Sequence, residues 1–286
     1  MTATEAAGIM SSVPERGFAR VDGKEARLLE KRYLRGVLDN LHALDEIPDP
    51  LSGRVLEVEY DPEALMTGNH RGRIRQRMAD LGVFDRERLA GIPLEGYVRY
   101  EAVQRGLLGV VGRVIVHAAC VCPADAFLKK GEATEPVGRL TVEDLFLRVV
   151  TRPEVFHYVG LFSPTGFSEE ACENLPVRNG AELVLVEKQE STRWTLHYAT
   201  PKLRPAFMSL FDAESRLEKT QRFYHALKEE ADLQYGGGFV LLEEMMEREG
   251  VSRSEAEAAI RRLLSEDDEI GLEEVDGKAI LKRRLV

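Results

Sequence analysis

The sequence predicts an α/β protein in which a mixed sheet is flanked by helices and is followed by a small C-terminal domain. Three observations lead to this class. Strand-like and helix-like segments alternate between residues 113 and 187. The connections between them are short, which is typical of a parallel or mixed sheet covered by helices. Three consecutive glycines at 236–238 then separate this part from a compact C-terminal segment.

Composition and charge set further limits. The chain has 286 residues, 44% hydrophobic and 31% charged, with a formal net charge of −10. Such a chain is typical of about two globular domains of ~100–200 residues. No apolar run reaches the ~18 residues of a membrane-spanning helix, so we expect no membrane partner. Three cysteines without framework spacing favour a reducing, cytoplasmic location.

The N-terminal part is predicted to be mainly helical. Residues 1–17 lack an apolar segment and are expected to form a flexible tail, not a secretory signal. The region 18–105 starts with an amphipathic helix over 23–45, where apolar residues recur every three or four positions. A run rich in β-branched and aromatic residues predicts a strand over 54–60. Asp61-Pro62 closes this strand, and a second helix is expected to follow and to end near Leu81-Gly82.

The sheet domain is expected over 106–212. Its first strand is the nearly continuous apolar run 110–122, whose valines favour a buried strand over a helix. A helix that begins at Thr141 and a short helix near Ser168 are expected to cover the sheet. The remaining strands are predicted at 155–162, 182–187 and 193–198, the last two close enough for a hairpin.

Residues 213–286 are predicted to form a linker helix and a helix–helix–hairpin domain. Gly250 separates two short helices, and Ser252 caps the second. Asp276-Gly277 is a strong hairpin signal between strand-like flanks. This order of elements resembles a winged helix-turn-helix.

A second resemblance lies in the sheet domain. The run VGLFSPTGFSEEA at 159–171 and the strand ELVLVE at 182–187 resemble the end of the Mrr-type restriction endonuclease domain. Over about residues 110–190 this resemblance implies a restriction-endonuclease-like sheet, a Rossmann-like sheet being the alternative. The family holds a divalent metal through carboxylates and a lysine, but the matching strand of this chain has His117-Ala118-Ala119-Cys120. The resemblance therefore implies a nuclease-like domain that has lost its active site.

A displaced nuclease site is the enzymatic alternative. Its candidate residues are Asp125, Glu187 and Lys188, which supply carboxylates and a lysine near strand ends. Mg²⁺ is expected as a cofactor only in that case. No catalytic motif such as a Walker loop is present, so that a non-enzymatic role is favoured.

The cysteines do not predict a metal site. Cys120 and Cys122 share one face of a strand while His117 points to the other face. Cys172 lies far away in the sequence, and the chain has no Cys-x-x-Cys pair, the spacing that is typical of zinc motifs. We therefore expect buried thiols, no metal and no other cofactor.

The turn between residues 163 and 168 is a candidate anion site, because it joins a buried strand to a helix N-terminus. Glu169 and Glu170 would repel an anion in the first turn, which favours simple capping of the helix. A sensor of small anions, coupled to the C-terminal domain, remains the alternative. Its candidate ligands are Ser163, Thr165, Gly166 and Ser168.

Arginines give the best indication of nucleic-acid binding. Four of them lie in two rows beside the apolar stripe of one predicted helix, and guanidinium groups bind phosphate bidentately. Pairing with nearby acids is the alternative interpretation. The four residues are Arg71, Arg73, Arg75 and Arg77.

The C-terminal domain adds arginines on its second helix, but its overall charge is negative. Residues 232–286 carry eight basic and fourteen acidic side chains, a net charge of −6. A protein partner or self-association through this domain is therefore at least as well favoured as DNA binding. Its candidate nucleic-acid contacts are Arg253, Arg261 and Arg262.

Taken together, the arginines of residues 71–77, the winged-helix order and the nuclease-like stretch without its lysine lead to one main hypothesis. The chain is expected to be a non-catalytic, nucleic-acid-associated protein or adaptor.

Overall fold

The computed structural model describes residues 20–83, 85–106, 109–149, 152, 154–188, 194–233, 239–275 and 277–283. The predicted tail at 1–17, the glycines at 236–238 and Asp276 of the predicted hairpin turn lie outside these residues. Within the described ranges, no helix combines the length and apolarity that a membrane crossing requires.

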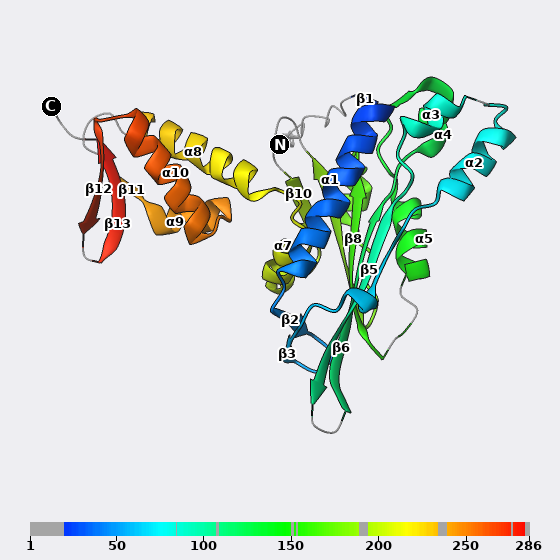
Figure 1. Cartoon of the computed structure of the whole chain (residues 1–286), viewed down its shortest axis with the longest axis horizontal. Helices are drawn as coiled ribbons and strands as arrows, with labels where there is room; N and C mark the ends of the chain where they lie inside the picture. Colours follow the sequence, from blue (N-terminus) through cyan, green and yellow to red (C-terminus); the bar gives the residue numbers. More distant parts are fainter. Residues whose placement is uncertain are drawn as a thin grey trace, which may run out of the picture.

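A six-stranded sheet forms the centre of the larger domain, with strand order β10-β9-β8-β6-β5-β4 (Figure 1). Three central strands are parallel and the outer ones are antiparallel to their neighbours, so that a mixed sheet flanked by helices is confirmed. The parallel strands are β6 (Gly109–Cys120), β8 (Phe156–Ser163) and β9 (Ala181–Lys188). The antiparallel strands are β4 (Leu65–Gly68), β5 (Tyr97–Gly106) and β10 (Trp194–Tyr198).

Helices cover both faces of this sheet. On one face, α1 (Gly23–His42) and α7 (Arg204–Phe211) pack around buried aromatic side chains such as Phe162. On the other, α5 (Arg139–Val149) and α6 (Glu169–Glu173) pack around Leu161. Strand β8 is buried at every position, which explains why its sequence reads as a continuous apolar run.

Shorter elements complete the larger domain. Three helices share a small core: α2 (Arg71–Asp80), α3 (Arg86–Ala90) and α4 (Ala124–Lys130). Two antiparallel strand pairs are formed by β1 (Val21–Asp22) with β7 (Glu132–Ala133) and by β2 (Glu46–Asp49) with β3 (Arg54–Glu57). Two 3-10 helices are η1 (Pro62–Ala64) and η2 (Pro201–Leu203).

The C-terminal domain has its own core and lies to one side of the sheet, connected through α8 (Figure 1). Its helices are α8 (Arg216–Leu233), α9 (Leu242–Glu249) and α10 (Arg253–Glu266). Its antiparallel sheet has the order β11-β13-β12, formed by β11 (Phe239–Leu241), β13 (Lys278–Arg283) and β12 (Ile270–Val275). Gly250 ends α9 with a left-handed φ of 63°, and Ser252 starts α10 with a capping box.

The structure differs from the sequence prediction in the N-terminal half. The boundary drawn between 105 and 106 cuts through one sheet, since β5 pairs with β6 along its whole length. The helix expected from Asp61-Pro62 to near Leu81-Gly82 is confirmed only in its second half, as α2, which ends at Asp80. Its first half is the short η1 and the strand β4, because residues 65–68 pair with β5. Helix α7 was not predicted, and the first of the two helices expected on either side of Gly250 begins only after the short strand β11.

Candidate functional site

Helix α2 presents the four arginines that the sequence marks as nucleic-acid contacts. Its apolar side is anchored by Ile74 and Met78, which are buried against α3 and α4. The amide of His70 donates to the carbonyl of Leu94 at 2.9 Å and fixes the start of the helix. All four arginines are therefore turned to solvent, and each is exposed: Arg71, Arg73, Arg75 and Arg77.

Two of these arginines are paired with acids. Arg73 forms an ion pair with Glu95, and Arg77 donates hydrogen bonds of 2.6 Å to both carboxylate oxygens of Asp125. The hydrogen bond from Arg77 lowers the pKa of Asp125. Among the described residues, Arg71 and Arg75 have no carboxylate partner. The interpretation of pairing with nearby acids therefore holds for Arg73 and Arg77.

Arginines on the sheet form a second cationic group, which the sequence did not reveal. Glu101 of β5 accepts ion pairs from Arg99 and Arg113, both at 3.1 Å, and from Arg152 at 3.7 Å. Three positive charges therefore surround one carboxylate. Arg99 is on the same strand as Glu101, whereas Arg113 reaches it through the pairing of β5 with β6 and Arg152 comes from the segment before β8. No sequence motif encodes this convergence.

The arginines of α10 are engaged within their own domain. Arg253 pairs with Glu257 at 3.2 Å, and Arg261 donates to the carbonyl of Glu257 at 3.2 Å. Arg262 pairs with Glu266 at 2.8 Å and lies over the ring of Tyr224, 4.3 Å from its centroid. These contacts hold the guanidinium groups along the helix.

The three candidates for a nuclease site are not brought together. Glu187 and Lys188 are consecutive residues of β9, so their side chains point to opposite faces of the sheet. Glu187 contacts the turn before α6, whereas burial and then the charge of Arg32, on the α1 side, lower the pKa of Lys188. Asp125 is at the start of α4 and is held by Arg77.

The turn from residue 163 to residue 168 uses its polar groups internally. The hydroxyls of Ser163 and Thr165 are buried and lie 3.2 Å apart, within hydrogen-bonding distance. Gly166 has a φ of 73°, a left-handed conformation that favours glycine. Ser168 accepts from the amide of Ala171 and caps α6, so the capping interpretation is confirmed. The amide of Phe167 donates to Glu187 at 3.2 Å, in the place where an anion would bind.

The same end of the sheet brings together a cysteine, a carboxylate and a histidine. Ligand-type atoms of Cys172, Glu187 and His197 all lie within 4.8 Å of one another. Nε2 of His197 is 2.9 Å from Oε1 of Glu187, whose side chain is only 7% exposed. Hydrogen bonds, first to Cys172 and then to Glu187, raise the pKa of His197 to about 9. Of these three, the sequence analysis named Glu187 as a candidate site residue, set Cys172 aside as a metal ligand and did not name His197.

The register of the hairpin explains why this cluster was missed. Thr195 pairs with Glu187 in the β9–β10 ladder, and His197 lies two residues further along on the same face. That diagonal relation follows only once the hairpin register is known. Cys172 reaches the cluster because Ser168 sets the start of α6 four residues earlier. The only signal in the sequence was the alternation of side chains along the predicted hairpin, which places His197 and Thr195 on the same face of the sheet.

Two other histidines, the half-buried His117 and the buried His157, form a pair on the same sheet. Nε2 of His117 on β6 lies 3.1 Å from Nδ1 of His157 on β8, and their rings are nearly parallel. Burial, followed by the charges of His157 and Arg99, lowers the pKa of His117 to about 3. Burial also lowers the pKa of His157. Both imidazoles are therefore neutral near pH 7.

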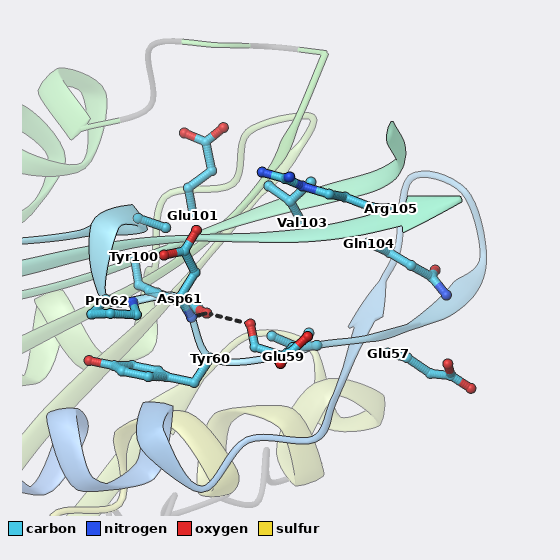
Figure 2. Close-up of a pocket in the computed structure, with 12 residues that line it drawn as sticks. Glu57, Glu59, Tyr60, Asp61, Pro62, Tyr100, Glu101, Val103, Gln104 and Arg105 are labelled. Atoms are coloured by element: carbon cyan, nitrogen blue, oxygen red, sulfur yellow. Dashed lines mark hydrogen bonds between the residues drawn. The ribbon is translucent and has the colours of Figure 1, made fainter. Parts of the chain in front are cut away.

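A hollow of about 600 Å³ lies where η1 meets strand β5 (Figure 2). In Figure 2, Glu101 and Arg105 project from one side of β5, whereas Tyr60 projects toward α1. The lining includes four carboxylates and one guanidinium group. The charge of this lining opposes an anionic ligand, except at Glu101, which is surrounded by Arg99, Arg113 and Arg152. The carboxylates of the lining are Glu57, Glu59, Asp61 and Glu101.

Comparison of the chain with protein-family models, with curated proteins and with solved structures finds no match.

Proposed function

We propose that this protein is a non-catalytic, nucleic-acid-associated protein or adaptor whose larger domain contacts the phosphate backbone through α2. The observation that carries this proposal is the exposure of Arg71 and Arg75 without a carboxylate partner among the described residues. They are four residues apart on one helix, so they lie on the same face. Guanidinium groups in such a position bind phosphate oxygens bidentately.

The paired arginines of α2 are not part of the proposed contact. Arg73 and Arg77 are held by Glu95 and Asp125, whose carboxylates repel a phosphate. The proposed contact therefore rests on Arg71 and Arg75. The arginines around Glu101 supply further positive charge in the same domain.

The fold is consistent with a nuclease-like domain that has lost its chemistry. Parallel strands that follow an antiparallel hairpin support the resemblance to the restriction endonuclease family. His117 to Cys120 stand on β6 where that family has a carboxylate and a lysine. Without those groups on this strand, nucleic-acid contact is a better use of the domain than cleavage.

The C-terminal domain fits the role of an adaptor. The order of α8, β11, α9, α10 and a β-hairpin supports the winged-helix interpretation. Its net charge of −6 over residues 232–286 and its internally paired arginines favour a protein partner or self-association. The free state of Cys120, Cys122 and Cys172 agrees with a cytoplasmic location.

Substitution of the two unpaired arginines tests the proposal. Fluorescence anisotropy measures the affinity of the full chain for duplex DNA, single-stranded DNA and RNA at low salt. We expect Arg71→Gln/Arg75→Gln to weaken binding about tenfold or more and, for duplex DNA, to reduce the salt slope by about 1.8, since two phosphate contacts are lost.

The matched control is Arg35→Gln/Arg148→Gln, which removes the same charge from exposed, acid-paired sites on α1 and α5. This variant should keep the wild-type affinity to within about twofold. Absence of binding by the wild type, or equal losses in the two variants, would contradict the proposal.

A further inference from the structure

We propose that Cys172, Glu187 and His197 form a zinc-binding site. The three side chains come from α6, β9 and β10, and their ligand-type atoms lie within 4.8 Å of one another. Thiolate, imidazole and carboxylate are the three side-chain types that Zn²⁺ accepts in proteins. Mg²⁺ and Ca²⁺ prefer oxygen ligands, so the sulfur and nitrogen donors select against them.

The mutual distances favour metal binding over a thiol–imidazole–carboxylate relay. In a relay, the thiol and the carboxylate contact opposite nitrogens of the imidazole and are held apart by the ring. Here the sulfur, the ring nitrogen and the carboxylate oxygen form a compact triangle. A triangle of donors is one face of the tetrahedron that zinc requires, with the ion near its centre.

The surroundings hold the carboxylate in place. Oε1 of Glu187 is directed toward His197, while Oε2 accepts a hydrogen bond from the amide of Phe167 at 3.2 Å. Contacts of this type orient metal ligands and raise metal affinity. The turn is itself fixed, because Val137 donates to Gly166 and Ser168 donates to Val137, both at 3.0 Å.

Access and coordination number indicate an open site. Cys172 is half-buried and the side chain of His197 is 16% exposed, so that an ion can enter from solvent. Three protein ligands leave the fourth tetrahedral position to water or a small exogenous donor, the arrangement of catalytic zinc sites. Binding releases the protons of the thiol and the imidazole to solvent. This inference is independent of the proposed nucleic-acid binding.

Metal titration of the full chain tests the site. The protein is treated with a chelator, and Zn²⁺ is then added in equilibrium dialysis, while Co²⁺ serves as a spectroscopic probe. We expect one equivalent of Zn²⁺ per chain, a higher Tm in the presence of Zn²⁺, and a thiolate-to-cobalt charge-transfer band.

Cys172→Ser and His197→Gln should each weaken Zn²⁺ binding about a hundredfold or more, because each removes one of three ligands. Cys172→Ser should also abolish the charge-transfer band. Cys122→Ala is the matched control, since this thiol is buried in a different core cluster, and it should leave both signals unchanged.

Circular dichroism confirms that each variant is folded. The isosteric Cys172→Ser change decides the outcome if His197→Gln does not fold. Less than one tenth of an equivalent of bound Zn²⁺ would overturn the proposal. Unchanged affinity in Cys172→Ser, or loss of the charge-transfer band in Cys122→Ala alone, would do the same.

Discussion

The two domains of this chain differ in how their arginines are paired with carboxylates. In the C-terminal domain arginines are paired within the fold: Arg222 lies between Glu214 and Glu249 and is only 15% exposed. In the larger domain Arg71 and Arg75 have no carboxylate partner among the described residues, and three arginines share Glu101. The chain as a whole carries −10, yet the proposed anion-binding surface lies where arginines outnumber their acidic partners. Local pairing, more than net charge, locates such a surface.

The largest expected difference between the domains is in acid stability. His117 is half-buried and has a pKa of about 3, whereas an unfolded histidine has a pKa near 6.5. Below pH 6.5 the unfolded chain therefore binds more protons, and the folded domain loses stability as the pH falls toward 3. Between pH 6.5 and pH 4 we expect His117 alone to cost on the order of 3 kcal/mol.

Urea unfolding at pH 7 and pH 4 measures this loss. Trp194, the single tryptophan of the chain, is buried in the larger domain, so its fluorescence reports on that domain. His117→Gln should flatten the pH dependence, while the exposed control His42→Gln should not. An equal loss of stability in wild type and His117→Gln would show that the histidine pair does not govern acid unfolding.

A smaller effect is expected from the paired charges of the C-terminal domain. Arg222 donates hydrogen bonds of 2.8 and 2.9 Å to Glu214 and one of 2.7 Å to Glu249. Arg222→Met leaves the buried carboxylate of Glu214 without a partner, which should destabilise the domain by about 2–3 kcal/mol. Faster hydrogen exchange of the α8 and α10 amides would report the change.

Arg253→Met is the control for this experiment, because Arg253 is 88% exposed and its pair with Glu257 contributes little. Exchange rates in that variant should match the wild type. If Arg222→Met also exchanges at the wild-type rate, the buried network does not stabilise the domain, and the contrast between the two domains fails.

Much of the fold could be predicted from local patterns in the sequence. The stripe that contains Tyr33 and Val37 predicted α1, and the apolar runs predicted β6 and β8. Strand β5 was missed because it alternates charged residues such as Arg99 with buried ones such as Tyr100 over a long, otherwise unmarked segment. Its place in the sheet depends on pairing with β6, a long-range contact.

The candidate sites were less predictable, because each depends on contacts between distant residues. The arginines of α2 were found since they are close in sequence, but their pairing with Glu95 and Asp125 was not. Cys172 and His197 are 25 positions apart and meet only through the placement of α6 and the register of β10. The periodicity of apolar residues shows which face of a single helix or strand is buried, but not which other element packs against that face.

The smallest expected effect concerns the arginines of α10. If the comparison of the two domains is right, Arg253→Gln/Arg261→Gln should change the affinity of the full chain for duplex DNA by no more than about twofold. The reason is that both side chains are already held by Glu257 and belong to an acidic domain. The same anisotropy assay as for α2 measures this. A loss of affinity as large as that of Arg71→Gln/Arg75→Gln would place α10, not α2, on the nucleic acid. The acidic residues 266–269 at the end of α10 would then have to point away from the phosphates, contrary to the electrostatic argument.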